Sequence, residues 1–122
     1  MANTYKDLLV WRKAKALAVD VYRATDRFPK HEIFGLTSQM RRAAVSVASN
    51  IAEGQGRGTK PDFAKFLCIA RGSLLELETQ LEIAVELGMG NADELRKLSE
   101  DCYKTLGLFN RLLNAMETKA RV

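Results

Sequence analysis

The 122-residue sequence contains only two prolines, Pro29 and Pro61, and long segments without proline separate them from the chain ends and from each other. Because proline disrupts the interior of a helix, this distribution leaves room for long helices. Alanine, leucine, glutamate, lysine and arginine are abundant, and all of them favour helix. The composition therefore predicts an all-α protein.

Long apolar runs are also missing. No stretch approaches the ~18 consecutive apolar residues needed to span a membrane. The N-terminal residues MANTYKDLLVWRK include neither the uninterrupted apolar region nor the cleavage site of a signal peptide. The two cysteines, Cys68 and Cys102, form no CxxC pair, which is typical of a protein with reduced thiols. We therefore expect a cytoplasmic protein.

Residues that carry out catalysis or bind metals are scarce. The single histidine, His31, lies between Lys30 and Glu32 in a predicted turn, where exposure to solvent is expected. A ferritin-like metal site would require Glu-x-x-His pairs, and the sequence has none. Cys68 and Cys102 have no neighbouring histidine that could activate them as nucleophiles. We therefore expect no enzyme activity, no cofactor and no metal site.

Apolar residues recur at spacings of three and four in segments covering about residues 7–27, 33–54, 60–87 and 92–118. This spacing is typical of amphipathic helices. The three connections are short, which favours antiparallel packing of consecutive helices. The sequence therefore predicts a single domain, residues 1–122, folded as an antiparallel up-down-up-down four-helix bundle.

Several residues mark the expected helix ends. Thr59 and Asn91 are suited to N-capping, and Glu94 would complete a capping box with Asn91. Gly54 and Gly88 are expected as helix C-caps. The glycines at 54, 56 and 58 do not form a nucleotide-binding loop, because the GxxxxGK[ST] order and a βαβ setting are both absent.

The first helix is expected to place a continuous side against the core. That side comprises Trp11, Ala14, Leu17, Ala18, Val21, Tyr22, Thr25 and Phe28.

The second helix has an apolar core side, a polar stripe and a third side that carries Val45, Ala48 and Ala52. Three such sides indicate contacts all around the helix. The polar stripe is expected to meet polar residues of the third helix, with an ion pair between Arg42 and Glu76. Pairing of Arg42 with Glu53 of a neighbouring subunit is an open alternative. The predicted polar cluster comprises Gln39, Arg42, Ser46, Asn50, Glu53, Ser73 and Glu76.

A family resemblance rests on the residues of this helix and on shorter motifs elsewhere. They are Gln39, the run 41–44, Ser46, the run 50–54, Arg57, Trp11, Tyr22, Phe28-Pro29, Phe34-Gly35-Leu36, the run 70–73 and Leu77-Glu78. The pattern resembles the four helix bundle protein family, also described as 23S ribosomal RNA intervening-sequence proteins. A related branch is the accessory variability protein of diversity-generating retroelements. The resemblance implies a homopentamer and, from that branch, binding of RNA and a reverse transcriptase.

Positive charge is concentrated in the first half of the chain. Residues 1–60 contain 11 Lys or Arg and 5 Asp or Glu, a balance of +6, whereas residues 61–122 contain 8 and 10, a balance of −2. Lysine and arginine can neutralise phosphates, so we expect salt-sensitive nucleic-acid binding without sequence preference. An outward stripe of Arg12, Arg23 and Arg27 is expected to bind, extended by Lys13, Lys15, Arg41, Arg57 and Lys60.

The alternative function is a protein-interaction scaffold without a nucleic-acid role. In that case the third side of the second helix, together with exposed Leu75 and Leu108, would contact other subunits or a protein partner. The sequence contains no RNP motif, KH loop or aromatic stacking surface that would favour RNA over DNA.

Overall fold

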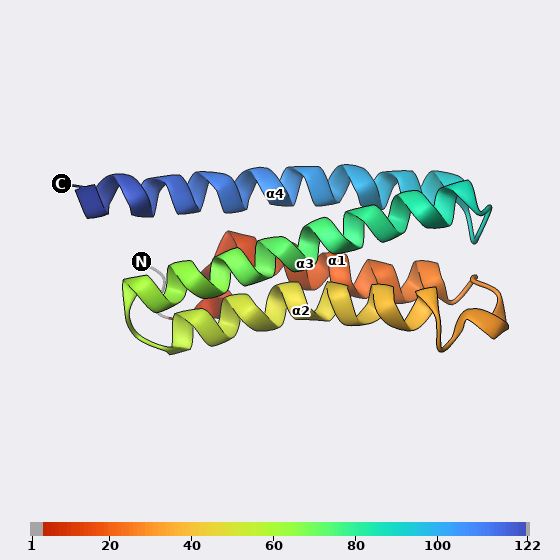
Figure 1. The fold of residues 1–122 in the computed structure, drawn as a ribbon, viewed down its shortest axis with the longest axis horizontal. Helices are drawn as coiled ribbons and strands as arrows, with labels where there is room; N and C mark the ends of the chain where they lie inside the picture. The colour runs from red at the N-terminus through yellow and green to blue at the C-terminus, as the bar shows by residue number, and fades with distance from the viewer. Residues whose placement is uncertain (1–3, 122) are drawn as a thin grey trace.

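The computed structural model describes residues 4–121, with side chains for residues 4–117. Its four helices are α1 (Leu9–Thr25), α2 (Leu36–Gly56), α3 (Lys60–Glu86) and α4 (Ala92–Arg121), and the short 3-10 helices η1 (Tyr5–Asp7) and η2 (Lys30–Glu32) precede α1 and α2. Residues 4–121 contain no strand. Consecutive helices run in opposite directions along the long axis (Figure 1). The predicted all-α four-helix bundle is confirmed.

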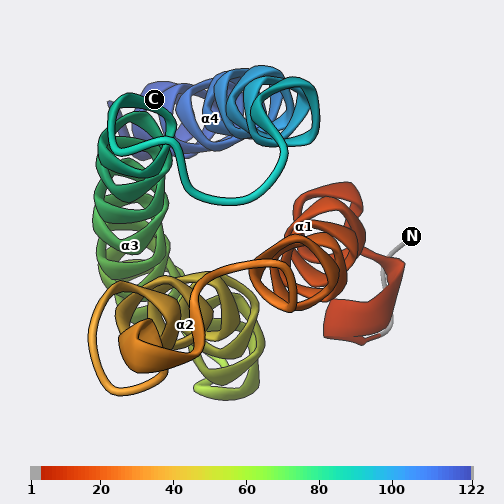
Figure 2. The ribbon, with the colours of Figure 1, turned by 90° about the vertical axis from the view of Figure 1, so that its right-hand side faces the viewer.

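Viewed from the end, the helices occupy the corners of a square, and α2 lies between α1 and α3 (Figure 2). Each helix packs on its neighbours in the chain, and α4 also packs on α1. The contact between α2 and α3 is the most extensive, and that between α1 and α4 is the least. Within residues 4–121, no helix has the length and apolar character that crossing a bilayer demands.

The residues that α1 buries in the core differ in part from the expected ones. Val10 and Ala24 are buried, whereas Tyr22 is 45 % exposed and Trp11 is only partly buried against the core. The two aromatic side chains flank the buried stripe, and long side chains at such margins cover the core edge while their polar tips stay wet. The buried residues of the other helices include Met40, Val47, Ile51, Leu67, Leu74, Leu77, Leu81, Leu95, Leu98 and Phe109.

Helices α1 and α2 begin later than expected, at Leu9 and Leu36 instead of about residues 7 and 33. The chain before α1 forms η1, whose N-cap residue Thr4 accepts a hydrogen bond from the Lys6 amide at 3.2 Å. The chain before α2 forms η2, and the Glu32 carboxylate then accepts a hydrogen bond from the Leu36 amide at 3.1 Å. Thr4 thus satisfies a backbone donor of η1, and Glu32 satisfies the first backbone donor of α2.

The prediction that Gly54 ends the second helix is wrong. Gly54 is buried inside α2, which continues to Gly56, and the turn to α3 uses Gly58 with φ +84°. A Cβ atom at Gly54 would lie 2.5 Å from the Cβ of Phe66. Gly54 is therefore required by the close packing of α2 on α3, and not by the end of a helix.

The other predicted caps agree with the structure. Thr59 accepts a hydrogen bond from the Asp62 amide at 3.3 Å, and Asn91 accepts one from the Glu94 amide at 2.9 Å. Gly88, with φ +72°, follows α3, and two backbone bonds of a Schellman motif close the helix end. The reciprocal half of the capping box is not formed in the described chain, and the Glu94 carboxylate lies 3.6 Å from Arg27, which follows α1.

Candidate nucleic-acid interface

The predicted phosphate-binding residues lie at two ends of the bundle. The first half of α1, the end of α2 and the start of α3 share one end, and the second half of α1 and the start of α2 share the other (Figure 1). Arg12, Lys13, Lys15, Arg57 and Lys60 belong to the first end, and Arg23, Arg27 and Arg41 belong to the second.

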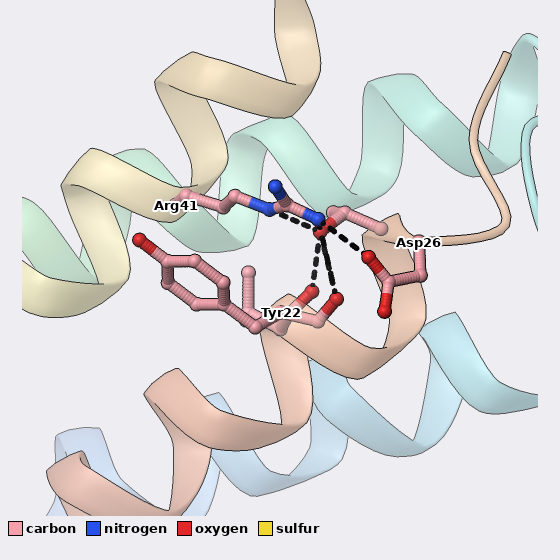
Figure 3. A network of polar contacts seen from close by, with 5 residues as sticks. Tyr22, Asp26 and Arg41 are labelled. Carbon is pink, nitrogen blue, oxygen red and sulfur yellow. Dashed lines mark hydrogen bonds and ion pairs between the residues drawn. The ribbon is translucent and has the colours of Figure 1, made fainter. Parts of the chain in front are cut away.

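Arg41 is not available as a phosphate ligand, contrary to the prediction. Its Nε donates to Thr25 Oγ1 at 2.8 Å, and its Nη2 donates to Asp26 Oδ1 at 3.0 Å and to the Tyr22 carbonyl at 3.4 Å (Figure 3). The guanidinium lies 4.7 Å from the centroid of the Tyr22 ring, and the side chain is only 20 % exposed. A cation at this place is favoured because the C-terminal end of α1 carries the negative end of the helix dipole.

Arg57 and Arg27 have acidic neighbours. Arg57 forms an ion pair with Glu53 at 3.0 Å, and Arg27 lies 3.6 Å from Glu94. Because both arginines are largely exposed, these pairs contribute only ~0–1 kcal/mol each. A phosphate can therefore compete for either arginine.

The remaining predicted ligands keep their charges available to solvent. Lys13, Arg23 and Lys60 are exposed and form no ion pair within the part of the chain described. Arg12 donates to a backbone carbonyl at 3.2 Å, and Lys15 lies over an aromatic ring, 5.5 Å from its centroid. Four of these five residues, all but Lys60, belong to α1.

Two further lysines join this surface, and the sequence reasoning missed them. Lys97 and Lys104 of α4 line a hollow of about 300 Å³ together with Lys13, Asp20 and Asp101. The charged groups around the hollow sum to +1, from three lysines and two aspartates. The signal for this grouping is spatial, because two whole helices, α2 and α3, separate Lys13 from Lys104 in the sequence.

The predicted polar cluster is partly assembled. Ser46 of α2 and Ser73 of α3 share a hydrogen bond of 2.9 Å, and Asn50 donates to the Ser46 carbonyl and hydroxyl at 2.8 and 2.9 Å. The polar flanks of α2 and α3 therefore meet at their crossing. Gln39, Arg42 and Glu76 lie at the rim of a hollow of about 420 Å³ beside these serines.

The predicted ion pair between Arg42 and Glu76 is wrong. Both residues line the same hollow and are exposed, but they form no ion pair with each other among the residues that the structure describes. In water such a pair gains little and loses side-chain entropy, so exposure removes the reason for pairing. Glu53, the alternative partner, is engaged by Arg57 of its own helix.

The titratable groups with shifted pKa values lie on the other side of the bundle. Burial, and then the neighbouring charge of Glu82, raise the pKa of Glu78 above its ordinary value. Burial raises the pKa of the Cys102 thiol to about 12, whereas Cys68 is exposed. Over the described residues, no three His, Cys, Asp or Glu side chains gather in a way that could hold a metal ion.

An apolar surface lies between α1 and α2. Val19, Tyr22, Val45 and Ala48 line an open hollow of about 570 Å³. Val19 and Val45 are 41 % and 42 % exposed. The prediction that Leu108 is exposed is wrong, because it is partly buried against the core beside α1.

Comparison with known proteins agrees with this architecture. The model of the family described as 23S rRNA-intervening sequence protein matches residues 6–111. A crystal structure is similar to this chain, that of a protein with unknown function from the S23 ribosomal protein family of Bacteroides thetaiotaomicron VPI-5482. Its TM-score is 0.76 and its identity 21 %, over 86 % of this chain and 98 % of that chain. At this sequence identity, the similarity to the crystal structure shows the fold alone. The search of curated proteins found no match to the sequence. Because the family model spans most of the four-helix bundle, the chain belongs to the 23S rRNA-intervening sequence protein family.

Proposed function

We propose that this chain is a non-enzymatic, homo-oligomeric helical-bundle protein that binds nucleic acid through basic residues on α1. The observation that carries the proposal is the row of exposed lysines and arginines along α1 that form no ion pair with any carboxylate of the described residues. Arg12, Lys13 and Arg23 are its main members. Binding to phosphates through such side chains requires no base-specific contacts and releases counterions.

One copy presents few free cations, so self-association is part of the proposal. Several copies of the α1 surface would raise the effective concentration of contacts along one nucleic-acid strand. The family resemblance supports five copies. It also supports a reverse transcriptase as a protein partner, for which the chain would act as an accessory factor.

The second candidate function is a protein-interaction scaffold that does not bind nucleic acid. The apolar hollow between α1 and α2 favours it, because exposed valines and a tyrosine on one face suit a protein partner. A scaffold would hold its partner mainly through apolar contacts, which depend little on salt.

A binding assay with labelled RNA and labelled duplex DNA distinguishes the two proposed functions. We expect fluorescence anisotropy to detect binding at low salt that falls steeply toward physiological salt. The slope of log K against log salt should be about −0.9 per phosphate neutralised on the duplex and about −0.7 on single strands. Binding that is absent at low salt would favour the scaffold.

Charge reversal locates the surface. Arg12→Glu, Lys13→Glu and Arg27→Glu together should abolish binding while leaving the oligomer intact, because none of the three lines the groove between α1 and α2. The matched control is Lys30→Glu, Lys65→Glu and Arg111→Glu, three exposed residues on other surfaces. Both triple variants change the net charge from +4 to −2, since each reversal removes two units. Equal loss of binding in both variants would contradict the assignment to α1.

A further inference from the structure

The outer side of α2 carries little charge for an exposed helix. Its 21 residues include only Arg41, Arg42 and Glu53 as charged side chains. Arg41 is turned into the contact with α1, and Glu53 is paired with Arg57. By contrast, the hollow between α1 and α4 is lined by five charged residues. The α4 side is therefore suited to water, and the α2 side is suited to a partner.

Two adjacent faces meet at α2, and each has a distinct shape. On the α1 side lies the apolar groove of Val19, Tyr22, Val45 and Ala48, with Lys15 and Arg23 at its rim.

On the α3 side lies an exposed ridge. Ile69 and Ile83 are 43 % and 42 % exposed, and Glu76 lies midway between them. Residues seven apart are about two turns apart on one side of a helix, so the three side chains form a row. Glu76 has no ion-pair partner among the described residues, although it is exposed beside the α2–α3 crossing.

We propose that the groove between α1 and α2 is the docking site for a second copy of this chain, which inserts its α3 ridge of Ile69, Glu76 and Ile83. The inference rests on the proposed self-association and names its contact surfaces. The match is both apolar and electrostatic: the isoleucines meet the groove, and Glu76 meets the basic rim of Lys15 and Arg23. A desolvated contact of this kind gives the unpaired carboxylate its partner.

The positions of the two faces decide the form of the assembly. Groove and ridge are different surfaces of one chain, so the contact is head-to-tail and repeats from copy to copy. The faces flank α2 at adjacent sides of the square bundle (Figure 2). A head-to-tail contact continues into a closed ring or an open filament, depending on the rotation between successive copies.

The inference is tested with two variants that each disable one surface. Val45→Glu places a charge in the groove, and Ile83→Glu places one on the ridge; both positions are exposed, so the fold should be retained. Circular dichroism checks the helix content, and light scattering after size exclusion measures the mass. Each variant alone should have the monomer mass of 13.6 kDa. Leu75→Glu is the matched control, because Leu75 is 48 % exposed but lines neither surface, and it should leave the wild-type mass unchanged.

Mixing the two variants gives the decisive result. The Val45→Glu chain keeps an intact ridge and the Ile83→Glu chain keeps an intact groove, so one contact can form between them. The mixture should contain a heterodimer of 27.2 kDa, which is twice 13.6 kDa, and nothing larger. A wild-type protein that is monomeric would contradict the proposed self-association itself. Three results with an oligomeric wild type would overturn only the assignment of groove and ridge. They are assembly of either variant alone, a mixture without heterodimer, and a wild-type dimer joined through its two ridges.

Discussion

At the scale of single residues, Gly54 determines how closely α2 approaches α3. A methyl group at this position would lie 2.5 Å from the Cβ of Phe66, much closer than two such atoms can approach, so the helices would have to move apart. We expect Gly54→Ala to lower the free energy of unfolding by about 1–3 kcal/mol, the usual cost of overpacking a core. Urea unfolding at a fixed protein concentration measures the change.

Gly56, one half-turn further along α2, is the control for this prediction. A Cβ atom at Gly56 would have no neighbour within 4 Å. Gly56→Ala should therefore raise the free energy of unfolding by about 0.4–1 kcal/mol, because alanine restricts the unfolded chain. Equal effects of the two substitutions would show that contact with Phe66 is not the cause.

Cys102 is a second residue whose surroundings predict a measurable property. Burial, and then the charges of Glu78 and Asp101, raise its pKa from 9.0 to about 12. Above pH 9.0 the unfolded thiol loses its proton while the folded thiol keeps it, so the folded state binds more protons. The free energy of unfolding should therefore fall as the pH rises above 9.0. Urea unfolding across this alkaline range checks the sign.

Substituting each cysteine in turn separates the contribution of the Cys102 thiol from that of other groups that titrate at alkaline pH. Cys102→Ala should weaken the fall in stability above pH 9.0, whereas Cys68→Ala should leave it unchanged, because Cys68 is exposed. In native protein near neutral pH, a thiol reagent should modify Cys68 alone, since the thiolate is the reactive form. Rapid modification of Cys102 in the folded protein would contradict the prediction.

At the scale of helices, Arg41 joins the end of α1 to the start of α2. The guanidinium reaches a hydroxyl, a carboxylate and a backbone carbonyl within residues 22–26, at the end of α1. Lysine cannot reproduce this fork of donors. We expect Arg41→Lys to lower the free energy of unfolding by about 1.5–3 kcal/mol, the usual contribution of charged hydrogen bonds. Thermal unfolding followed by circular dichroism measures the loss.

The neighbouring arginine provides a control with the same chemistry. Arg42 is exposed and forms no ion pair within the described part of the chain. Arg42→Lys should therefore change the free energy of unfolding by no more than about 0.5 kcal/mol. If the two substitutions had equal effects, the hydrogen bonds of Arg41 would not stabilise the junction of α1 and α2.

At the scale of the whole molecule, the charge difference between the chain halves becomes a difference between faces. Exposed lysines and arginines follow α1, while Glu78, Glu82, Glu86 and Glu100 surround a hollow between α3 and α4. An anionic polymer that approaches the bundle therefore meets an attractive side and a repulsive side. The sparsely charged side of α2 lies between α1 and α3, so the proposed assembly covers the edge of α1 at Lys15 and Arg23. Arg12 and Lys13 do not line the groove and remain open to nucleic acid.

The amino-acid sequence by itself determined the four helices and most of their caps. Helical periodicity and caps such as Thr59 and Asn91 depend on residues within four positions of each other, so they can be recognised locally. The up-down-up-down order follows from the short connections for the same reason. The positive charge of α1 was also predictable, because this helix contains four Lys or Arg and only one Asp.

Tertiary structure alone decided which charges are engaged and where the helices come closest. Arg41 and its neighbour Arg42 are identical as side chains, yet one is enclosed by α1 and the other is exposed. Gly54 belongs to a glycine run that suits a helix end, and only the position of Phe66 shows that it serves packing. Such outcomes depend on the rotation of each helix about its axis and on the distance between axes. Side chains far apart in the sequence set both quantities together, so local patterns do not contain them.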